Sequence, residues 1–177
     1  MNKYISGLMM ILLFISCQQQ GVDKGKKKIR QEVPKATEFR PANDTHTRKL
    51  HGQQVYVPIY SSIYNEYEGN LLHMTALLSI RNISQKESIM IKKIEYYDTN
   101  GKLLKKYIDR PFILGKMSSK DIVIPEKDLS GGTGANFVVE WGSEKFVAVP
   151  IIESVMLGSV GTKGFSFSSR GKEIEAH

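Results

Sequence analysis

Three glycines in four positions, Gly131, Gly132 and Gly134, form the spacing that comes nearest to a known chemistry. Glycine-rich loops can cradle phosphate, because their backbone N–H groups approach the anion closely when a strand precedes the loop and a helix follows it. Here the loop runs into "NFVVEW", which is a strand pattern, and no lysine stands where a Walker loop has one. The glycines therefore indicate a tight loop that enters a strand, and phosphate binding is not expected.

Two explanations of these glycines stay open. The loop crosses another strand end of the same domain, or a partner's backbone comes close enough that a Cβ would intrude. The internal explanation is preferred, because packing constraints are commoner than binding sites. Under the second explanation, the partner-facing residues would be Gly131, Gly132, Gly134 and Asn136.

No other pattern of residues predicts catalysis or metal binding. His46 and His51 are five positions apart, which is not a metal-ligand spacing, and the acidic residues are scattered along the chain. No cofactor and no metal site are predicted, and we expect that the protein is not an enzyme. An envelope enzyme of unknown class on the same fold is the alternative.

The N-terminus predicts export and lipidation. "MNKYISGLMMILLFISC" has a basic start and a short apolar core that ends on a small residue, so residues 1–16 are predicted to be a signal peptide. "FISC" resembles the lipobox of bacterial lipoproteins, and this resemblance implies acyl chains, palmitate among them, on Cys17. Several acyl chains anchor a protein stably, whereas one holds it only marginally. Gln18 follows the cysteine in place of the aspartate that retains some lipoproteins in the inner membrane, which favours the outer membrane. The segment after the cysteine lacks the acidic run expected of a surface-export signal, which favours the periplasmic face.

The positive charge is concentrated before the predicted domain. The whole chain has a formal net charge of +7, and residues 18–50 contain nine Lys and Arg against four Asp and Glu. The segment 17–50 is polar and poor in apolar residues, so we expect a disordered basic tether that spans about 30 Å. Two interpretations of its lysines stay open: the tether lies along anionic headgroups, or it is a solvated linker with incidental lysines. The remainder from His51 is nearly neutral, and nucleic-acid binding is not expected.

Residues 51–177 carry strand patterns throughout. "LLHMTALLSIRN" alternates between an apolar face and a mostly polar one, and the same period places Phe137, Val139 and Trp141 on one face. Asn100-Gly101 predicts a two-residue type I′ hairpin turn, and Lys92 interrupts an apolar face, which indicates an edge or a bulge. About seven to eight short strands and no convincing long helix predict an all-β, immunoglobulin-like antiparallel β-sandwich.

Several blocks of the sequence resemble one family. "VYVPIYSSIY", "IEYYDTNGKLLKKYIDRPFILG", "GGTGANFVVEW" and "PIIESVMLGSVGTKGFSFSSRGK" are similar to the domain-of-unknown-function 3124 family of bacterial exported proteins. The resemblance implies no activity, cofactor or catalytic residue. We therefore expect a lipid-anchored envelope protein with one binding or structural module, whose partners are the membrane and another envelope protein, a peptide or a glycan.

Overall fold

The computed structural model describes residues 50–177, all of them in strands and connections without a helix. The predicted signal peptide (1–16), Cys17 and His46 lie outside these residues. The strands are β1 His51–Pro58, β2 Ser62–Asn65, β3 Tyr67–His73, β4 Thr75–Arg81, β5 Ile89–Tyr97, β6 Leu103–Lys106, β7 Phe112–Leu114, β8 Ser119–Ile124, β9 Asn136–Ser143, β10 Ile151–Val160, β11 Lys163–Arg170 and β12 Lys172–Ala176. No helix of the described part is long and apolar enough to span a membrane.

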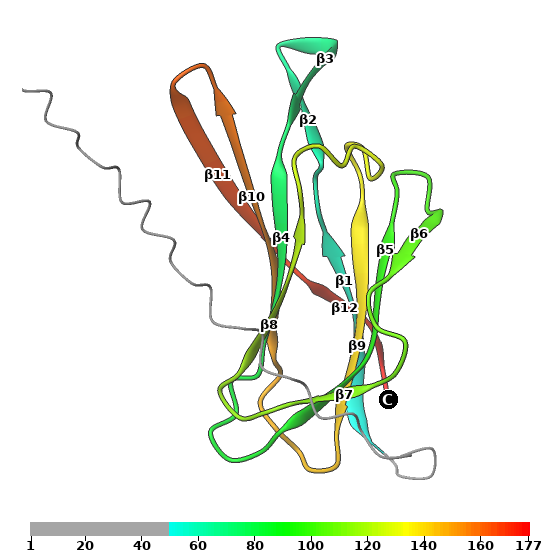
Figure 1. Ribbon diagram of the computed structural model, residues 1–177. Helices are drawn as coiled ribbons and strands as arrows, with labels where there is room; N and C mark the ends of the chain where they lie inside the picture. The colour runs from blue at the N-terminus through cyan, green and yellow to red at the C-terminus, as the bar shows by residue number, and fades with distance from the viewer. Residues whose placement is uncertain (1–49) are drawn as a thin grey trace, which may run out of the picture. The chain divides into compact units, whose positions relative to one another are not determined.

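Two antiparallel sheets form the sandwich (Figure 1). The larger sheet has the order β12-β1-β9-β5-β6, and β7 also pairs with β5. The smaller sheet has the order β11-β10-β4-β8, and β2 and β3 form a separate hairpin. The predicted all-β sandwich is confirmed. Its immunoglobulin-like type stays a prediction.

The core lies between the sheets and follows the alternation of the sequence. β9 contributes Phe137, Val139 and Trp141, and the exposed fraction of Trp141 is only 3%. β4 contributes Ala76, Leu78 and Ile80 from the opposite sheet. The burial of Trp141 beside its two apolar neighbours is therefore confirmed, because a period of two places all three side chains on the inner face.

The hairpin at Asn100-Gly101 forms, but its turn differs from the prediction. Gly101 has a φ of +78°, while Asn100 is not among the residues with positive φ. A type I′ turn needs positive φ at both positions, so the predicted turn type is wrong. The register of β5 against β6 instead shifts between Tyr96 and Tyr97, as in a longer hairpin loop with a glycine bulge. The Asp98 Oδ1 accepts the N–H groups of Asn100 and Lys102, so Asp98 caps this turn.

Prolines and a bulge mark places where the chain changes its partner strand. β1 ends at Pro58, and β10 begins directly after Pro150, where the chain has passed from the larger sheet to the smaller one. The pairing of β5 with β9 shifts between Ile91 and Lys93, so Lys92 lies at a bulge. The interpretation of Lys92 from the sequence is confirmed.

The structure contains more strands than the seven to eight expected. The apolar run at residues 71–80 is divided into β3 and β4, because the N–H of Met74 donates to the carbonyl of Ser61 and not to a neighbouring strand of the sheet. β12 also forms on the free edge of β1. The partner of β12 is distant in the sequence, so the local pattern does not reveal that strand.

Candidate functional site

The glycine loop lies between β8 and β9 and contacts the domain's own residues. Gly131 is buried, and a Cβ added there would overlap the hydroxyl of Tyr96 and lie 2.7 Å from the Oγ of Ser61. Gly132 has a φ of +74°, in the left-handed region that favours glycine. A Cβ at Gly134 would lie 3.3 Å from the Cγ2 of Thr99.

Hydrogen bonds attach this loop to two other segments. The Gly131 carbonyl accepts the backbone N–H of Thr99 at 3.0 Å and the Thr99 hydroxyl at 2.9 Å. The Gly132 carbonyl accepts the N–H groups of Ser61 and Ser62. Such contacts within the domain are enough to exclude side chains at Gly131. Contact of the loop with a partner stays a prediction. The loop is followed by the strand β9, as the sequence indicates.

The predicted loop residue Asn136 is the first residue of β9. It pairs with Pro58 on β1 and with Tyr97 on β5. Asn136 is therefore held between two strands, while Gly134 is exposed to solvent. The structure brings the four predicted residues together at one end of the sandwich, beside the turn that contains Thr99.

The β2–β3 hairpin projects at this same end and carries exposed apolar side chains (Figure 1). Tyr64 and Leu71 form a directly opposed pair across the two strands, and 57% of Tyr64 is exposed. Val160, at the end of β10, is also exposed at the tip of the neighbouring β10–β11 hairpin. We call Tyr64, Leu71 and Val160 the hairpin-end patch. Sequence reasoning missed this patch, although Leu71 is an apolar residue on a mostly polar face.

A serine and a histidine are hydrogen-bonded across the β2–β3 hairpin. The Oγ of Ser62 lies 2.9 Å from the Nδ1 of His73. Nucleophilic catalysis needs an accessible nucleophile and a base that a third group orients. Ser62 is only 2% exposed, and its N–H is already bonded to Gly132. The pair therefore links the two strands of the hairpin and does not form an accessible catalytic site.

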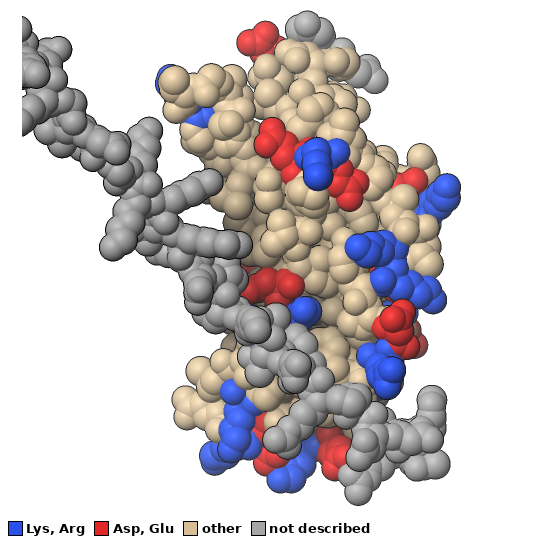
Figure 2. Space-filling view, viewed as in Figure 1, with Lys and Arg blue, Asp and Glu red and all other residues tan. Residues whose placement is uncertain are grey.

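An ionic cluster covers the outer face of the larger sheet. Glu95 ion-pairs with Lys106 at 3.3 Å, Glu140 ion-pairs with Lys92 at 3.3 Å, and Lys93 lies about equally far from both carboxylates. In Figure 2, acidic and basic side chains are intermixed over the visible face. Each of the two carboxylates is therefore within ion-pair distance of two lysines.

A short hydrogen bond within this cluster shifts two pKa values in opposite directions. The hydroxyl of Tyr97 donates to the Oε2 of Glu95 at 2.6 Å. This bond, assisted by Lys106 and Lys93, lowers the pKa of Glu95 below its ordinary value although burial acts against the shift. The same bond, with burial, raises the pKa of Tyr97 to about 12. The Glu95 carboxylate thus stays charged because donors surround it.

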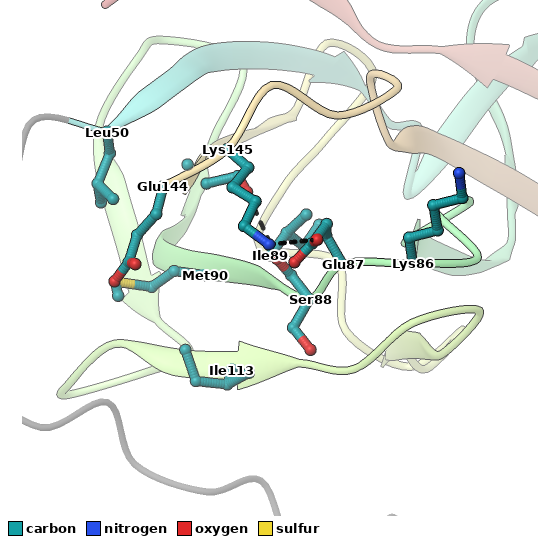
Figure 3. A pocket seen from close by; sticks show the side chains of 11 residues that line it. Leu50, Lys86, Glu87, Ser88, Ile89, Met90, Ile113, Glu144 and Lys145 are labelled. Atoms are coloured by element: carbon teal, nitrogen blue, oxygen red, sulfur yellow. Dashed lines mark hydrogen bonds and ion pairs between the residues drawn. The ribbon is translucent and has the colours of Figure 1, made fainter.

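Two shallow cavities lie at the opposite end of the sandwich, where Leu50 leads into β1. One of about 270 Å³ has Leu50, Ile89, Met90 and Ile113 among its lining residues (Figure 3). On its rim, the Lys145 Nζ forms an ion pair with the Oε1 of Glu87 at 2.7 Å.

The second cavity, of about 220 Å³, is lined by Trp141, Phe146 and Val149, with His51 at its edge. The indole Nε1 of Trp141 is buried and is the one buried side-chain nitrogen or oxygen among the described residues that has no hydrogen-bond partner. Phe146 is 89% exposed and makes an edge contact with the His51 ring at 5.8 Å. The sequence places Phe146 in an apolar run, but the residue lies in the connection between β9 and β10.

Comparison with known proteins identifies the family. The sequence model of the family described as "Protein of unknown function (DUF3124)" matches residues 52–174. The chain therefore belongs to this family, as its sequence blocks indicate. None of the curated proteins matches the chain.

One solved structure is similar over most of the chain. It is the crystal structure of Thermotoga maritima 1070, at 13% sequence identity and a TM-score of 0.44. The match covers 71% of this chain and 97% of that one.

Proposed function

We propose that the protein is a lipoprotein of the bacterial cell envelope, anchored through Cys17 at the periplasmic face of the outer membrane, whose β-sandwich binds a protein or peptide partner at the hairpin-end patch. The "FISC" sequence supports the anchor. The observation that carries the binding role is the exposed Tyr64–Leu71 pair on a projecting hairpin. Contiguous exposed apolar surface on a soluble domain is a feature of interaction sites.

Two features favour a protein segment over a glycan as the partner. The hairpin-end patch is apolar, because it consists of Tyr64, Leu71 and Val160. The ion pairs around Glu95 lie elsewhere, on the outer face of the larger sheet. Aromatic and aliphatic side chains of this kind commonly occupy the centre of protein interfaces. The glycine loop and Thr99 then form the rigid base from which the hairpin projects.

The anchor is tested by the Cys17→Ala variant in the native bacterium. Loss of the acylation site should leave the precursor unprocessed or release the domain from the membrane fraction. Cys17→Ser, which retains a similar size, should behave like Cys17→Ala. Normal maturation and unchanged membrane retention of both variants would contradict the anchor.

The binding role is tested by photo-crosslinking in living cells. A photoreactive phenylalanine analogue is placed at position 64 and, as a control, at position 123, because Tyr64 and Val123 are equally exposed at 57%. We expect an adduct of one defined mass from position 64 and none from position 123. The same set of adducts from both positions, or none from position 64, would refute a specific site at the hairpin end.

A further inference from the structure

The end of the sandwich at Leu50 carries a second set of exposed apolar side chains, and these belong to three different connections. Met117 is 65% exposed and Phe146 is 89% exposed, each within a short connection between strands. Val149 is exposed in the same connection as Phe146, and Ile83 is exposed in the connection between β4 and β5. We call Ile83, Met117, Phe146 and Val149 the tether-end surface.

Hydrogen bonds hold the three connections together, so the tether-end surface is one feature of the fold. The side-chain amide of Asn82, which is 2% exposed, donates to the carbonyls of Leu114 and Gly115, and the N–H of Met117 donates to the carbonyl of Ser84. These bonds join residues 82–88 to residues 114–118. The ion pair of Lys145 with Glu87 adds the connection that carries Phe146 (Figure 3).

Basic side chains are interspersed with these apolar ones. Lys86, Lys116 and Lys145 are exposed on the same three connections, which also carry Glu87 and Glu144, so their formal charge is +1. In Figure 2, blue and red side chains lie together at the lower end of the domain. Apolar tips separated by lysines are typical of surfaces that enter the interface of an anionic bilayer, where the apolar groups pass below the headgroups and the lysines remain among them.

The backbone conformation of Met117 is uncommon for a residue with a side chain. Met117 has a φ of +54°, a conformation that residues with a Cβ adopt uncommonly. Glycine or asparagine would meet this turn with less strain, and the exposed side chain of Met117 is not part of the core. A role outside the fold accounts for a large apolar residue at this position.

The place where the chain enters the domain identifies the occupant of this surface. Leu50 lines the same cavity as Glu87 and Lys145, and it precedes β1 directly (Figure 3). The predicted anchor Cys17 is 33 positions earlier in the sequence. The predicted tether thus joins the domain at the end that carries Met117 and Phe146, so this end is the one nearest to the anchor along the chain.

We propose that the tether-end surface docks on the anionic lipid bilayer to which the chain is anchored, with Phe146 and Met117 inserted among the lipids. This inference rests on the proposed lipid anchor at Cys17. Docking fixes the orientation of a domain that would otherwise rotate on its tether. The hairpin-end patch with Tyr64 then faces away from the membrane, where a partner can reach it (Figure 1).

The test uses the lipidated full-length protein reconstituted in vesicles of phosphatidylethanolamine and phosphatidylglycerol. A single cysteine replaces Phe146 or Met117, with Tyr64→Cys and Val160→Cys as controls at the other end, and each is labelled with an environment-sensitive fluorophore. All four residues are exposed, and thermal melting of each variant verifies that it folds. We expect blue-shifted emission and quenching by nitroxide-labelled lipids at positions 146 and 117, and neither effect at positions 64 and 160.

The outcomes separate this inference from the proposed anchor. A parent chain that takes up thiol label at Cys17 and fails to float with the vesicles refutes the anchor itself. A chain that floats, with positions 146 and 117 as accessible to water as position 64, leaves the anchor in place and refutes docking. Shielding of position 146 without lipid quenching, seen only after an envelope extract is added, identifies a protein surface and also overturns the proposal.

Discussion

Gly131→Ala tests whether the glycine loop is constrained by the domain itself. The position is buried, and the added methyl group would overlap the hydroxyl of Tyr96 and come within 2.8 Å of the Cβ of Ala135. Real Cβ atoms do not make such contacts, so either the loop or the Tyr96 ring must move. The hydroxyl of Tyr96 has little freedom, because it is hydrogen-bonded to the Oγ of Ser61 at 3.0 Å within the core.

The expected loss of stability has two parts. Overpacking of a well-packed site costs about 1–3 kcal/mol. Displacement of Tyr96 also breaks its bond to Ser61, which is fully buried, and a buried polar group without a partner costs about 1–3 kcal/mol. Together we expect Gly131→Ala to lower the free energy of unfolding by about 2–6 kcal/mol, equivalent to a fall in Tm of roughly 6–30 °C for a domain of this size.

The assay is thermal and urea unfolding followed by circular dichroism, with Gly134→Ala as the matched control. Gly134 belongs to the same loop, is exposed, and would place its Cβ no closer than 3.3 Å to Thr99. Its substitution should change stability by less than about 0.5 kcal/mol. Equal stability of Gly131→Ala and Gly134→Ala would show that the loop yields easily, and the internal explanation of the glycines would then fail.

A double-mutant cycle locates the clash. Tyr96→Phe removes the hydroxyl that the new methyl group would overlap, so Gly131→Ala should cost about 1–2 kcal/mol less in that background than in the parent. The contacts with Ser61 and Ala135 remain, so the recovery is partial. Strict additivity of the two substitutions would place the strain elsewhere in the loop.

Features set by neighbouring residues could be predicted from the sequence. The period of two placed Trp141 beside Phe137 and Val139 on one face, and the Lys92 interruption indicated a bulge. Each of these depends on a few consecutive side chains whose preferences agree with the fold. The exact turn type was missed because the bulge at Tyr96 and Tyr97 depends on the pairing with β6.

Features set by distant residues could not be predicted in the same way. β12 has the sequence "KEIEA" and all five side chains exposed, so it forms a strand through its backbone pairing with β1 and not through burial. The neighbours of Gly131 are Ser61 and Tyr96, which lie far away along the chain. The exposure of Phe146 likewise follows from its place in the connection between two sheets, because an apolar run has the same pattern in a strand and in a crossing loop.

The remaining predictions concern the core, the turn and the outer face. Trp141→Ala should cost about 3–5 kcal/mol, and the parent's Trp emission should be blue-shifted, because this residue is buried; a Tm within a degree or two of the parent would contradict it. Asp98→Ala should cost about 1–2 kcal/mol in urea unfolding, because two backbone N–H groups lose their acceptor, whereas Asp98→Asn should retain most of the stability. Glu95→Gln should remove the pH dependence that this carboxyl group gives to the free energy of unfolding. The pKa of Glu95 is lowered in the folded state, so its contribution is present above the ordinary value of 4.5 and is lost as the pH falls through the folded pKa. The stability difference between the parent and Glu95→Gln should therefore shrink in acid, and a difference that is constant between about pH 3 and pH 7 would show that the bonds from Tyr97 and the lysines do not favour the carboxylate.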